Sequence, residues 1–261
     1  MAVLSPKWAA KSAFALFCTP YRKPRNVPPP IFEKCNLFSL EIENQKLWGY
    51  SWNENADKKA LIIHGFESRA YQFDRYIGPL LKKGYAVYAM DAKAHGRSDG
   101  KTIVLPEYVA MIKGLTDKVG NFDAYISHSF GGMAISLFLE KYPNPEAKVV
   151  LLAPATETAT AIRFFCNFFQ LGPQVKREIE NLVKQKSGKE VSFYSMKRII
   201  PALSNHILWI HDTDDDITPY HDMEPLIHAE LKHVEFMITD GLGHRRIYKE
   251  NKVVKKVVEF L

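Results

Sequence analysis

The chain has 261 residues, of which 46% are hydrophobic and 25% are charged, and its formal net charge is +6. This composition is typical of a globular protein with a substantial core, and it excludes an intrinsically disordered chain. The basic residues are dispersed, with their densest runs at residues 21–25 and 244–256, so we expect solvent-exposed basic faces and no nucleic-acid site.

The three cysteines, Cys18, Cys35 and Cys166, are an odd number with mostly apolar neighbours. They favour a reducing compartment, so we predict a cytoplasmic protein without a disulfide framework. No apolar run approaches the roughly 18 residues that a membrane-spanning helix needs. We therefore expect no stable insertion into a membrane, whereas peripheral contact stays open. No residue cluster has the spacing of a metal site or a phosphate loop, so neither a metal nor a cofactor is expected.

Residues 1–34 are predicted to form a helix followed by a proline-rich arm. Ser5 and Pro6 are typical of a helix N-terminus, and Pro20 ends the apolar stretch that follows. The three prolines at residues 28–30 favour extended structure. We expect this helix to pack on the body of the protein, and its role is open.

Residues 35–261 are predicted to form one α/β domain. Alternating apolar and polar residues on either side of Glu43 and Asn44 predict a β-hairpin. Short apolar runs then alternate with stretches of helical periodicity, and such runs are typical of strands buried on both faces. The runs are residues 60–65, 85–91, 124–127, 148–154, 206–212 and 233–239. This order predicts a mostly parallel, doubly wound sheet with helices on both sides and an N-terminal hairpin.

A long connection between two predicted strands, about residues 156–205, is expected to form a small helical cap. Within it, Phe164, Phe165, Phe168 and Phe169 have a spacing that gives one wide apolar stripe on a helix. This stripe is expected to pack the cap onto the body. We also expect Phe164, Phe165 and Phe168 to contribute to the wall of a substrate pocket, because ligand sites are lined mainly by apolar and aromatic groups.

The strongest chemical signal surrounds Ser129. Residues 127–131 read Ser-His-Ser-Phe-Gly, between a predicted strand and a predicted helix. This is the context of a nucleophile elbow, G-x-S-x-G, with a serine in place of the first glycine. The turn requires small residues two positions before and after the nucleophile, and Ser127 and Gly131 meet that requirement.

Three further motifs also follow predicted strands. Residues 62–68, IIHGFES, can aim a backbone N–H at a developing oxyanion, and we expect the oxyanion donors to be the N–H groups of Phe66 and Phe130. Residues 211–219 supply several carboxylates, and residues 240–247 place His244 in a glycine-flanked loop. The chain order Ser, Asp, His matches one hydrolase architecture and differs from the other serine-protease arrangements.

With these motifs the sequence resembles the α/β-hydrolase superfamily, in its capped serine esterase and lipase branch, over roughly residues 35–261. Residues 91–100, DAKAHGRSDG, are similar to that family's D-x-R-G-x-G-x-S turn, with Lys93 and Ala94 where Arg and Gly are usual. The resemblance implies an α/β-hydrolase fold.

The resemblance also implies a Ser129–His244–Asp215 triad, in which Asp215 is aligned through Pro219 and Asp214 is the alternative acid. His244 would act as the base, and Asp215 would fix its tautomer. We expect His64 to be a structural residue that hydrogen-bonds the oxyanion loop.

The predicted function is hydrolysis of a small-molecule carboxylic ester with an apolar acyl or alcohol part, through an acyl-enzyme. A lysophospholipase- or monoacylglycerol-lipase-like activity falls within this range. The alternatives are a thioesterase or another acyl hydrolase, and a non-catalytic binding protein on the same fold. The sequence leaves the natural substrate, the acyl length and the oligomeric state open.

Overall fold

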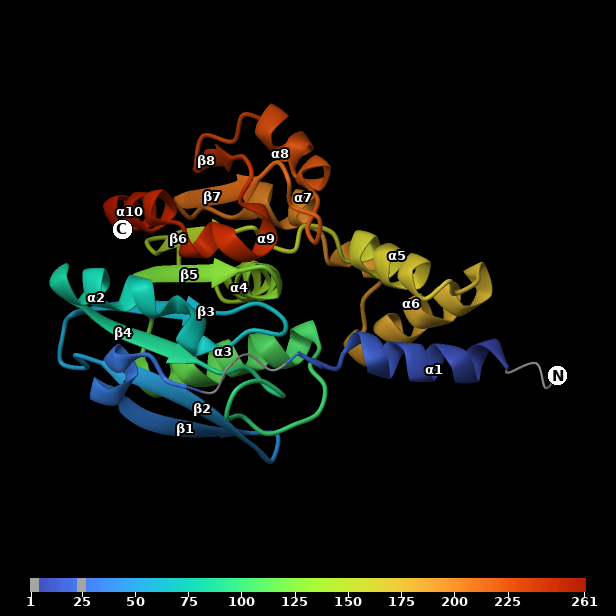
Figure 1. The fold of residues 1–261 in the computed structure, drawn as a ribbon, viewed down its shortest axis with the longest axis horizontal. Helices are drawn as coiled ribbons and strands as arrows, with labels where there is room; N and C mark the ends of the chain where they lie inside the picture. Colours follow the sequence, from blue (N-terminus) through green and yellow to red (C-terminus); the bar gives the residue numbers. More distant parts are fainter. Residues whose placement is uncertain (1–4, 23–26) are drawn as a thin grey trace.

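The computed structural model describes residues 5–22 and 27–261, and a twisted eight-stranded sheet lies at its centre (Figure 1). Its spatial order is β1-β2-β4-β3-β5-β6-β7-β8. The strands are β1 (Asn36–Ile42), β2 (Gln45–Trp52), β3 (Lys58–Ile63), β4 (Tyr85–Met90), β5 (Ala124–His128), β6 (Lys148–Leu152), β7 (Ile207–Asp212) and β8 (Val234–Thr239). The hairpin strands β1 and β2 are antiparallel, β2 is antiparallel to β4, and all other neighbours are parallel.

The predicted fold class is confirmed. Each of the six apolar runs forms a strand at the predicted place, and the hairpin turns at Glu43 and Asn44. These two residues have φ values of 50° and 59°. Positive φ at both central positions is characteristic of the type I′ turn, whose twist matches that of the paired strands.

Helices cover both faces of the sheet and bury two separate cores. The principal helices are α1 (Pro6–Phe17), α2 (Asp74–Lys82), α3 (Leu105–Val119), α4 (Phe130–Lys141), α5 (Thr158–Phe168), α6 (Pro173–Ser187), α7 (Met196–Ile199), α8 (Glu224–His228), α9 (Gly243–Arg246) and α10 (Asn251–Phe260). Helices α3 and α4 pack on one face, and α2 and α10 pack on the other. Along β3, Leu61 and Ile63 enter the first core while Ala60 and Ile62 enter the second, as the alternation of a strand requires.

The connection between β6 and β7 forms a helical cap beside the carboxyl ends of the parallel strands (Figure 1). Its main helices are α5 and α6, which pack together with α1 from the N-terminal segment. After α6, residues 191–202 form three short helices, of which α7 is the α-helix and the other two are 3₁₀ helices. Between the first two of these, Ser195 forms an isolated antiparallel bridge with Glu157. No helix in the described ranges is long and apolar enough to cross a membrane.

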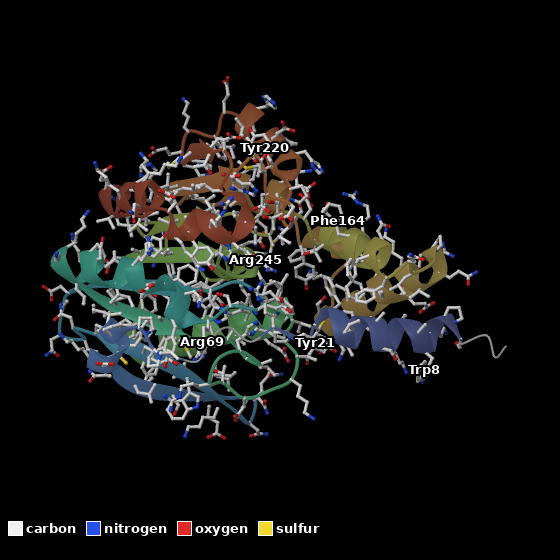
Figure 2. The ribbon with its side chains drawn as sticks, viewed as in Figure 1. Trp8, Tyr21, Arg69, Phe164, Tyr220 and Arg245 are labelled. Carbon is white, nitrogen blue, oxygen red and sulfur yellow. The ribbon has the colours of Figure 1, made fainter. Side chains whose placement is uncertain are left out.

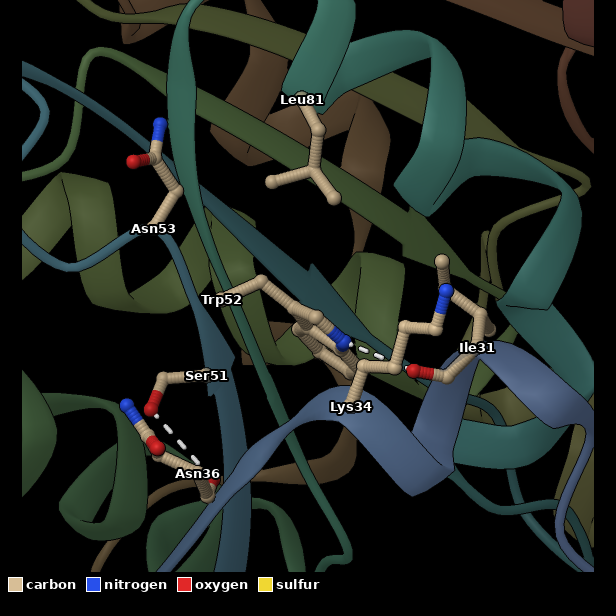
Figure 3. Close-up of a pocket in the computed structure, with 7 residues that line it drawn as sticks. All are labelled: Ile31, Lys34, Asn36, Ser51, Trp52, Asn53 and Leu81. Carbon is tan, nitrogen blue, oxygen red and sulfur yellow. Dashed lines mark hydrogen bonds between the residues drawn. The ribbon is translucent and has the colours of Figure 1, made fainter.

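A shallow pocket of about 380 Å³ lies near the end of β2 (Figure 3). Trp52 forms part of its wall and donates a hydrogen bond from Nε1 to the carbonyl oxygen of Ile31 at 3.0 Å. Trp52 is paired in register with Val87 near the amino end of β4. The pocket therefore lies at the amino ends of the parallel strands, whereas Ser129 follows the carboxyl end of β5.

The turn after β4 is organised by the buried Asp91 carboxylate. It accepts hydrogen bonds from the Tyr50 hydroxyl at 2.9 Å and from the backbone N–H groups of Ala70 and Arg97 at 2.9 and 3.0 Å. A Cβ atom at Gly96 would lie 2.0 Å from Oδ2 of Asp91. The turn therefore requires glycine at position 96. Through the Ala70 N–H it also holds the loop that follows β3.

Ala94 occupies the left-handed region in this turn, with φ of 64°. We expect Ala94→Gly to raise the free energy of unfolding, by up to about 1 kcal/mol. Relief of left-handed strain is worth about 1–2 kcal/mol, whereas the greater freedom of the unfolded chain costs about 0.4–1 kcal/mol. Urea denaturation followed by circular dichroism measures the change. The matched control is Ala229→Gly at φ of −74°, which should destabilise the protein; an equal effect at both sites would contradict the strain argument.

Candidate active site

Ser129 stands on a sharp turn between β5 and α4, with φ of 53° and ψ of −123°. This conformation is rare for a residue with a side chain, and it persists only where the surroundings hold it. The Ser129 N–H donates to the carbonyl of Leu152 at 3.1 Å, and the Ser129 carbonyl accepts from Ala155 N–H at 2.9 Å. A Cβ atom at Gly131 would lie 2.5 Å from the carbonyl oxygen of His64. The small residue at this position thus allows α4 to begin directly against β3.

His244 and Asp215 complete a hydrogen-bonded chain with Ser129. Nε2 of His244 lies 2.9 Å from Oγ of Ser129, and Nδ1 lies 2.8 Å from Oδ2 of Asp215. All three residues are buried, with exposed fractions of 8%, 6% and 5% for Ser129, His244 and Asp215. In the tautomer that satisfies both contacts, Nδ1–H donates to Asp215 and Nε2 accepts from the serine hydroxyl. The arrangement can therefore move a proton from Ser129 to His244.

Asp215 is held in position by the loop that carries it. Its Oδ1 accepts from the backbone N–H groups of Ile217 and Thr218 at 2.9 and 2.7 Å, and its Oδ2 accepts from the Thr218 hydroxyl at 2.9 Å. Burial alone would raise the pKa of this carboxyl group, but the hydrogen bond and charge of His244 and the Thr218 N–H lower it below its ordinary value. Asp214, the alternative acid, is exposed, and the contact to His244 is made by Asp215.

Asp212 is a residue whose role the sequence did not reveal. Its carboxylate accepts hydrogen bonds from the backbone N–H groups of Leu242 and Gly243 at 3.1 and 2.9 Å, and from the Thr239 hydroxyl at 2.6 Å. Burial tends to raise the pKa of Asp212, but these donors lower it. An ionised carboxylate thus anchors the loop that ends at His244. The Gly-Leu-Gly sequence before His244 could have indicated such an anchor, because the N–H groups of a buried glycine-rich loop need an acceptor.

His128 also contributes to the position of His244. Its Nε2 lies 3.1 Å from the backbone carbonyl of His244, and its ring centroid is 4.5 Å from that of Tyr248. Nε2–H is the donor in this contact, because a carbonyl only accepts. His128, the residue before Ser129, therefore connects the elbow to the loop that carries His244.

The segment after β3 lies directly against the elbow. A Cβ atom at Gly65 would be 2.8 Å from Cβ of Ser129. His64 braces this segment as expected, since Nδ1 contacts the Gly65 carbonyl at 2.7 Å and Nε2 accepts from Ala92 N–H at 2.9 Å. In the described part of the chain, the N–H groups of Phe66 and Phe130 have no hydrogen-bond acceptor. Both are thus free to bind an oxyanion formed next to Ser129.

A cavity of about 680 Å³ opens above Ser129, between the body, the cap, and α1 with the residues that follow it. Its lining is mainly apolar and includes Phe14, Leu16, Phe17, Cys18, Phe66, Ile103, Phe130, Met133, Phe165, Phe168, Phe169, Val183 and Ile217. Two of the three phenylalanines expected to line it, Phe165 and Phe168, do so. Phe164 does not: it is 37% exposed beside Arg163, and Phe169 lines the cavity instead. The Phe164 ring instead lies against the Arg163 guanidinium, whose Cζ is 5.6 Å from the ring centroid, so it packs outside the cavity.

Four buried histidines make the folded state sensitive to acid. The pKa values of His64, His95, His128 and His211 are all lowered, chiefly because burial disfavours the charged ring. The unfolded chain binds these protons with an ordinary pKa near 6.5, so below that pH it takes up more protons than the folded chain. The contribution of these histidines to the free energy of unfolding is therefore fully present above about pH 6.5. It is lost as the pH falls toward their lowered folded-state pKa values.

We expect the melting temperature to be nearly constant from pH 8 to 7 and to fall steadily between about pH 6.5 and 5. Thermal melts followed by circular dichroism measure this slope. His211→Asn should reduce the slope, whereas His221→Asn, at an exposed position, should leave it unchanged. A melting temperature that is flat between pH 7 and 5 would refute the expectation.

Comparison with known proteins identifies the family. The family described as serine aminopeptidase, S33, matches residues 54–186, about half of the chain. The chain belongs to this family. With it, the protein belongs to the α/β-hydrolase superfamily, as the sequence motifs indicated. The matched region includes residues 62–68 and Ser129 and ends before Asp215 and His244.

Among curated relatives of this S33 protein, serine hydrolase-like protein 2 of Homo sapiens is 27% identical over 166 residues, 60% of this chain and 51% of that protein. Monoglyceride lipase of Rattus norvegicus is 23% identical over 200 residues, 70% of this chain and 64% of the lipase. The chain thus spans about half the length of the first relative and just under two thirds of the second.

Solved structures share the fold. The esterase Pf2001 of Pyrococcus furiosus aligns with a TM-score of 0.67 at 23% identity, over 93% of this chain and 95% of the esterase. Est1E of Butyrivibrio proteoclasticus, with ferulic acid bound, aligns with a TM-score of 0.70 at 19% identity, over 85% and 97%. The family match thus places the chain in the α/β-hydrolase superfamily, and these solved structures share its fold.

Proposed function

We propose that the protein is a serine hydrolase that cleaves carboxylic esters with an apolar acyl or alcohol part. The observation that carries the proposal is the buried chain Ser129–His244–Asp215, which opens into a largely apolar cavity. A serine whose hydroxyl faces a histidine base, itself oriented by a carboxylate, is the arrangement that activates an alcohol as a nucleophile.

In the proposed mechanism, Oγ of Ser129 attacks the ester carbonyl carbon while Nε2 of His244 takes the hydroxyl proton. Asp215 stabilises the imidazolium that forms, and the N–H groups of Phe66 and Phe130 bind the tetrahedral oxyanion. As the intermediate collapses, the ester C–O bond breaks and His244 returns the proton to the leaving alkoxide. Water, deprotonated by His244, then attacks the acyl carbon. The bond between that carbon and Oγ of Ser129 breaks, His244 returns the proton to Oγ, and the carboxylic acid is released.

The family name raises aminopeptidase activity as an alternative. An aminopeptidase needs a group that recognises the free α-ammonium of its substrate, and a carboxylate would serve. Of the carboxylates that line the cavity, Glu67 accepts a hydrogen bond from Arg22 N–H at 3.0 Å, and Glu157 accepts one from Ser195 at 2.7 Å. Because the remaining walls are mainly apolar, the cavity favours an ester with an apolar chain. Turnover of an aminoacyl anilide tests whether either carboxylate recognises an ammonium group.

The test is steady-state turnover of p-nitrophenyl acetate, butyrate, octanoate and dodecanoate, with leucine p-nitroanilide and an octanoyl thioester as competing substrates. We expect ester hydrolysis to exceed anilide hydrolysis and to rise from acetate toward octanoate. Faster thioester turnover would favour the thioesterase alternative. A folded protein that hydrolyses none of these compounds yet binds fatty acids would support a binding protein instead.

A further inference from the structure

We infer that the N-terminal helix α1 and the residues after it form the far wall of the cavity and set its preference for the apolar chain of the substrate. The inference rests on the proposed function and assigns specificity to a segment that the family match, beginning at residue 54, does not include. It concerns residues 5–22, which we call the N-terminal segment.

The N-terminal segment contributes directly to the cavity that holds Ser129. Its lining residues are Phe14, Leu16, Phe17, Cys18, Thr19 and Tyr21. Phe17 and Leu16 are only partly buried, so their side chains stay available to a ligand. In Figure 2, Tyr21 lies at the end of the segment that meets the body, whereas Trp8 lies toward the outer end of α1.

The wall is anchored to the cap. Ala10, Ala13 and Phe14 are buried on the cap side of α1, where they form a cluster with cap residues such as Ile162 and Ile179. Phe17 contacts Phe165 of α5 edge to face, with ring centroids 5.2 Å apart. Because aromatic pairs of this geometry attract each other, one ring from the N-terminal segment and one from the cap form a continuous surface.

The wall is also anchored to the body, close to the chemistry. The carbonyl of Cys18 accepts a hydrogen bond from Ile103 N–H at 3.0 Å. Arg22 N–H donates to the carboxylate of Glu67 at 3.0 Å, and Glu67 directly follows the proposed oxyanion donor Phe66. The segment is therefore fixed at both ends of the cavity, so its side chains can define a pocket of stable shape.

A purely structural role for α1 would need only the buried side chains that pack on the cap. Phe17 goes beyond that role because its ring lines the cavity as well as contacting Phe165. An acyl chain that extends from Ser129 along the apolar walls can bury methylene groups against such a ring, whereas an acetyl group is too short to benefit. Chain-length selectivity is thus the property that the segment controls.

The experiment compares Phe17→Ala and Phe17→Leu with Trp8→Ala, a control on the same helix whose side chain is 60% exposed and does not line the cavity. The readout is the ratio of kcat/KM for p-nitrophenyl dodecanoate to that for the acetate. This ratio is independent of the folded fraction, so partial unfolding of a variant does not mimic the effect. We expect Phe17→Ala to lower it about tenfold, Phe17→Leu to lower it less, and Trp8→Ala to leave it unchanged.

A ratio within twofold of wild type in Phe17→Ala would overturn the inference, as would an equal loss on both substrates. Failure of wild type to hydrolyse any of the p-nitrophenyl esters would instead overturn the proposed function. In that case the binding of a pyrene-labelled dodecanoic acid, followed by fluorescence, tests the wall without turnover. Weaker binding by Phe17→Ala than by Trp8→Ala supports the inference, and equal binding overturns it.

Discussion

Replacing Ser129 by alanine is expected to lower kcat for ester hydrolysis by about 10⁶-fold, to the level left by binding and the oxyanion donors alone. The variant keeps Cβ and therefore the strained turn, while it removes the oxygen that lies 2.9 Å from His244. The measurement is turnover of p-nitrophenyl octanoate, together with mass spectrometry after treatment with a fluorophosphonate probe. The adduct should map to Ser129 in wild type and be absent in the variant.

Ser136→Ala is the matched control, because Ser136 is a buried serine of α4, the helix that follows Ser129. Its hydroxyl donates a hydrogen bond to the Gly132 carbonyl at 2.9 Å. The Ser136→Ala variant should retain both turnover and labelling. Undiminished activity in Ser129→Ala, or an adduct at another residue, would refute the assignment of the nucleophile.

Replacing Asp215 by asparagine is expected to reduce kcat by about 10⁴-fold with little change in the fold. An asparagine amide can donate to Nδ1 of His244 and so favours the wrong tautomer, with the proton on Nε2 facing the serine. It also removes the negative charge that stabilises the imidazolium. The comparison is with Asp214→Asn, one residue earlier on the exposed side of the same loop, which should change kcat only a few-fold.

A larger loss in Asp214→Asn than in Asp215→Asn would reassign the acid. Thermal melts of both variants are needed, because Asp215 also accepts hydrogen bonds from Ile217 and Thr218. If both variants lose similar stability but Asp215→Asn loses far more kcat than Asp214→Asn, Asp215 has a catalytic role.

The sheet was predictable because strands buried on both faces produce continuous apolar runs, and the hairpin because its turn carries residues that tolerate positive φ. The elbow could also be located, since Ser127 and Gly131 provide the small side chains it requires. The alignment through Pro219 favoured Asp215 and kept Asp214 as the alternative acid, because three consecutive aspartates differ little in a sequence. The backbone of the loop directs Asp215 toward His244 and leaves Asp214 exposed.

Other features escaped prediction because they depend on tertiary placement. Asp212 acts on a loop that begins some thirty residues later, and His128 acts through a carbonyl oxygen that no sequence pattern identifies. The helix at Pro6–Phe17 was expected from its N-terminal signals, but it packs on the cap and not on the body as expected. This packing places it at the cavity that Ser129 also lines. Phe164 was misplaced because its ring packs against the Arg163 side chain, a contact that the spacing of the four phenylalanines does not reveal.

The packing of α1 on cap residues as distant as Val191 has a consequence for synthesis on the ribosome. The helix leaves the exit tunnel well before its partners and is too short to be stable alone in water. Its apolar face therefore has no packing partner, and stays accessible to chaperones, until the cap has been translated. The cavity over Ser129 is thus completed only after the cap has been made and α1 has docked on it.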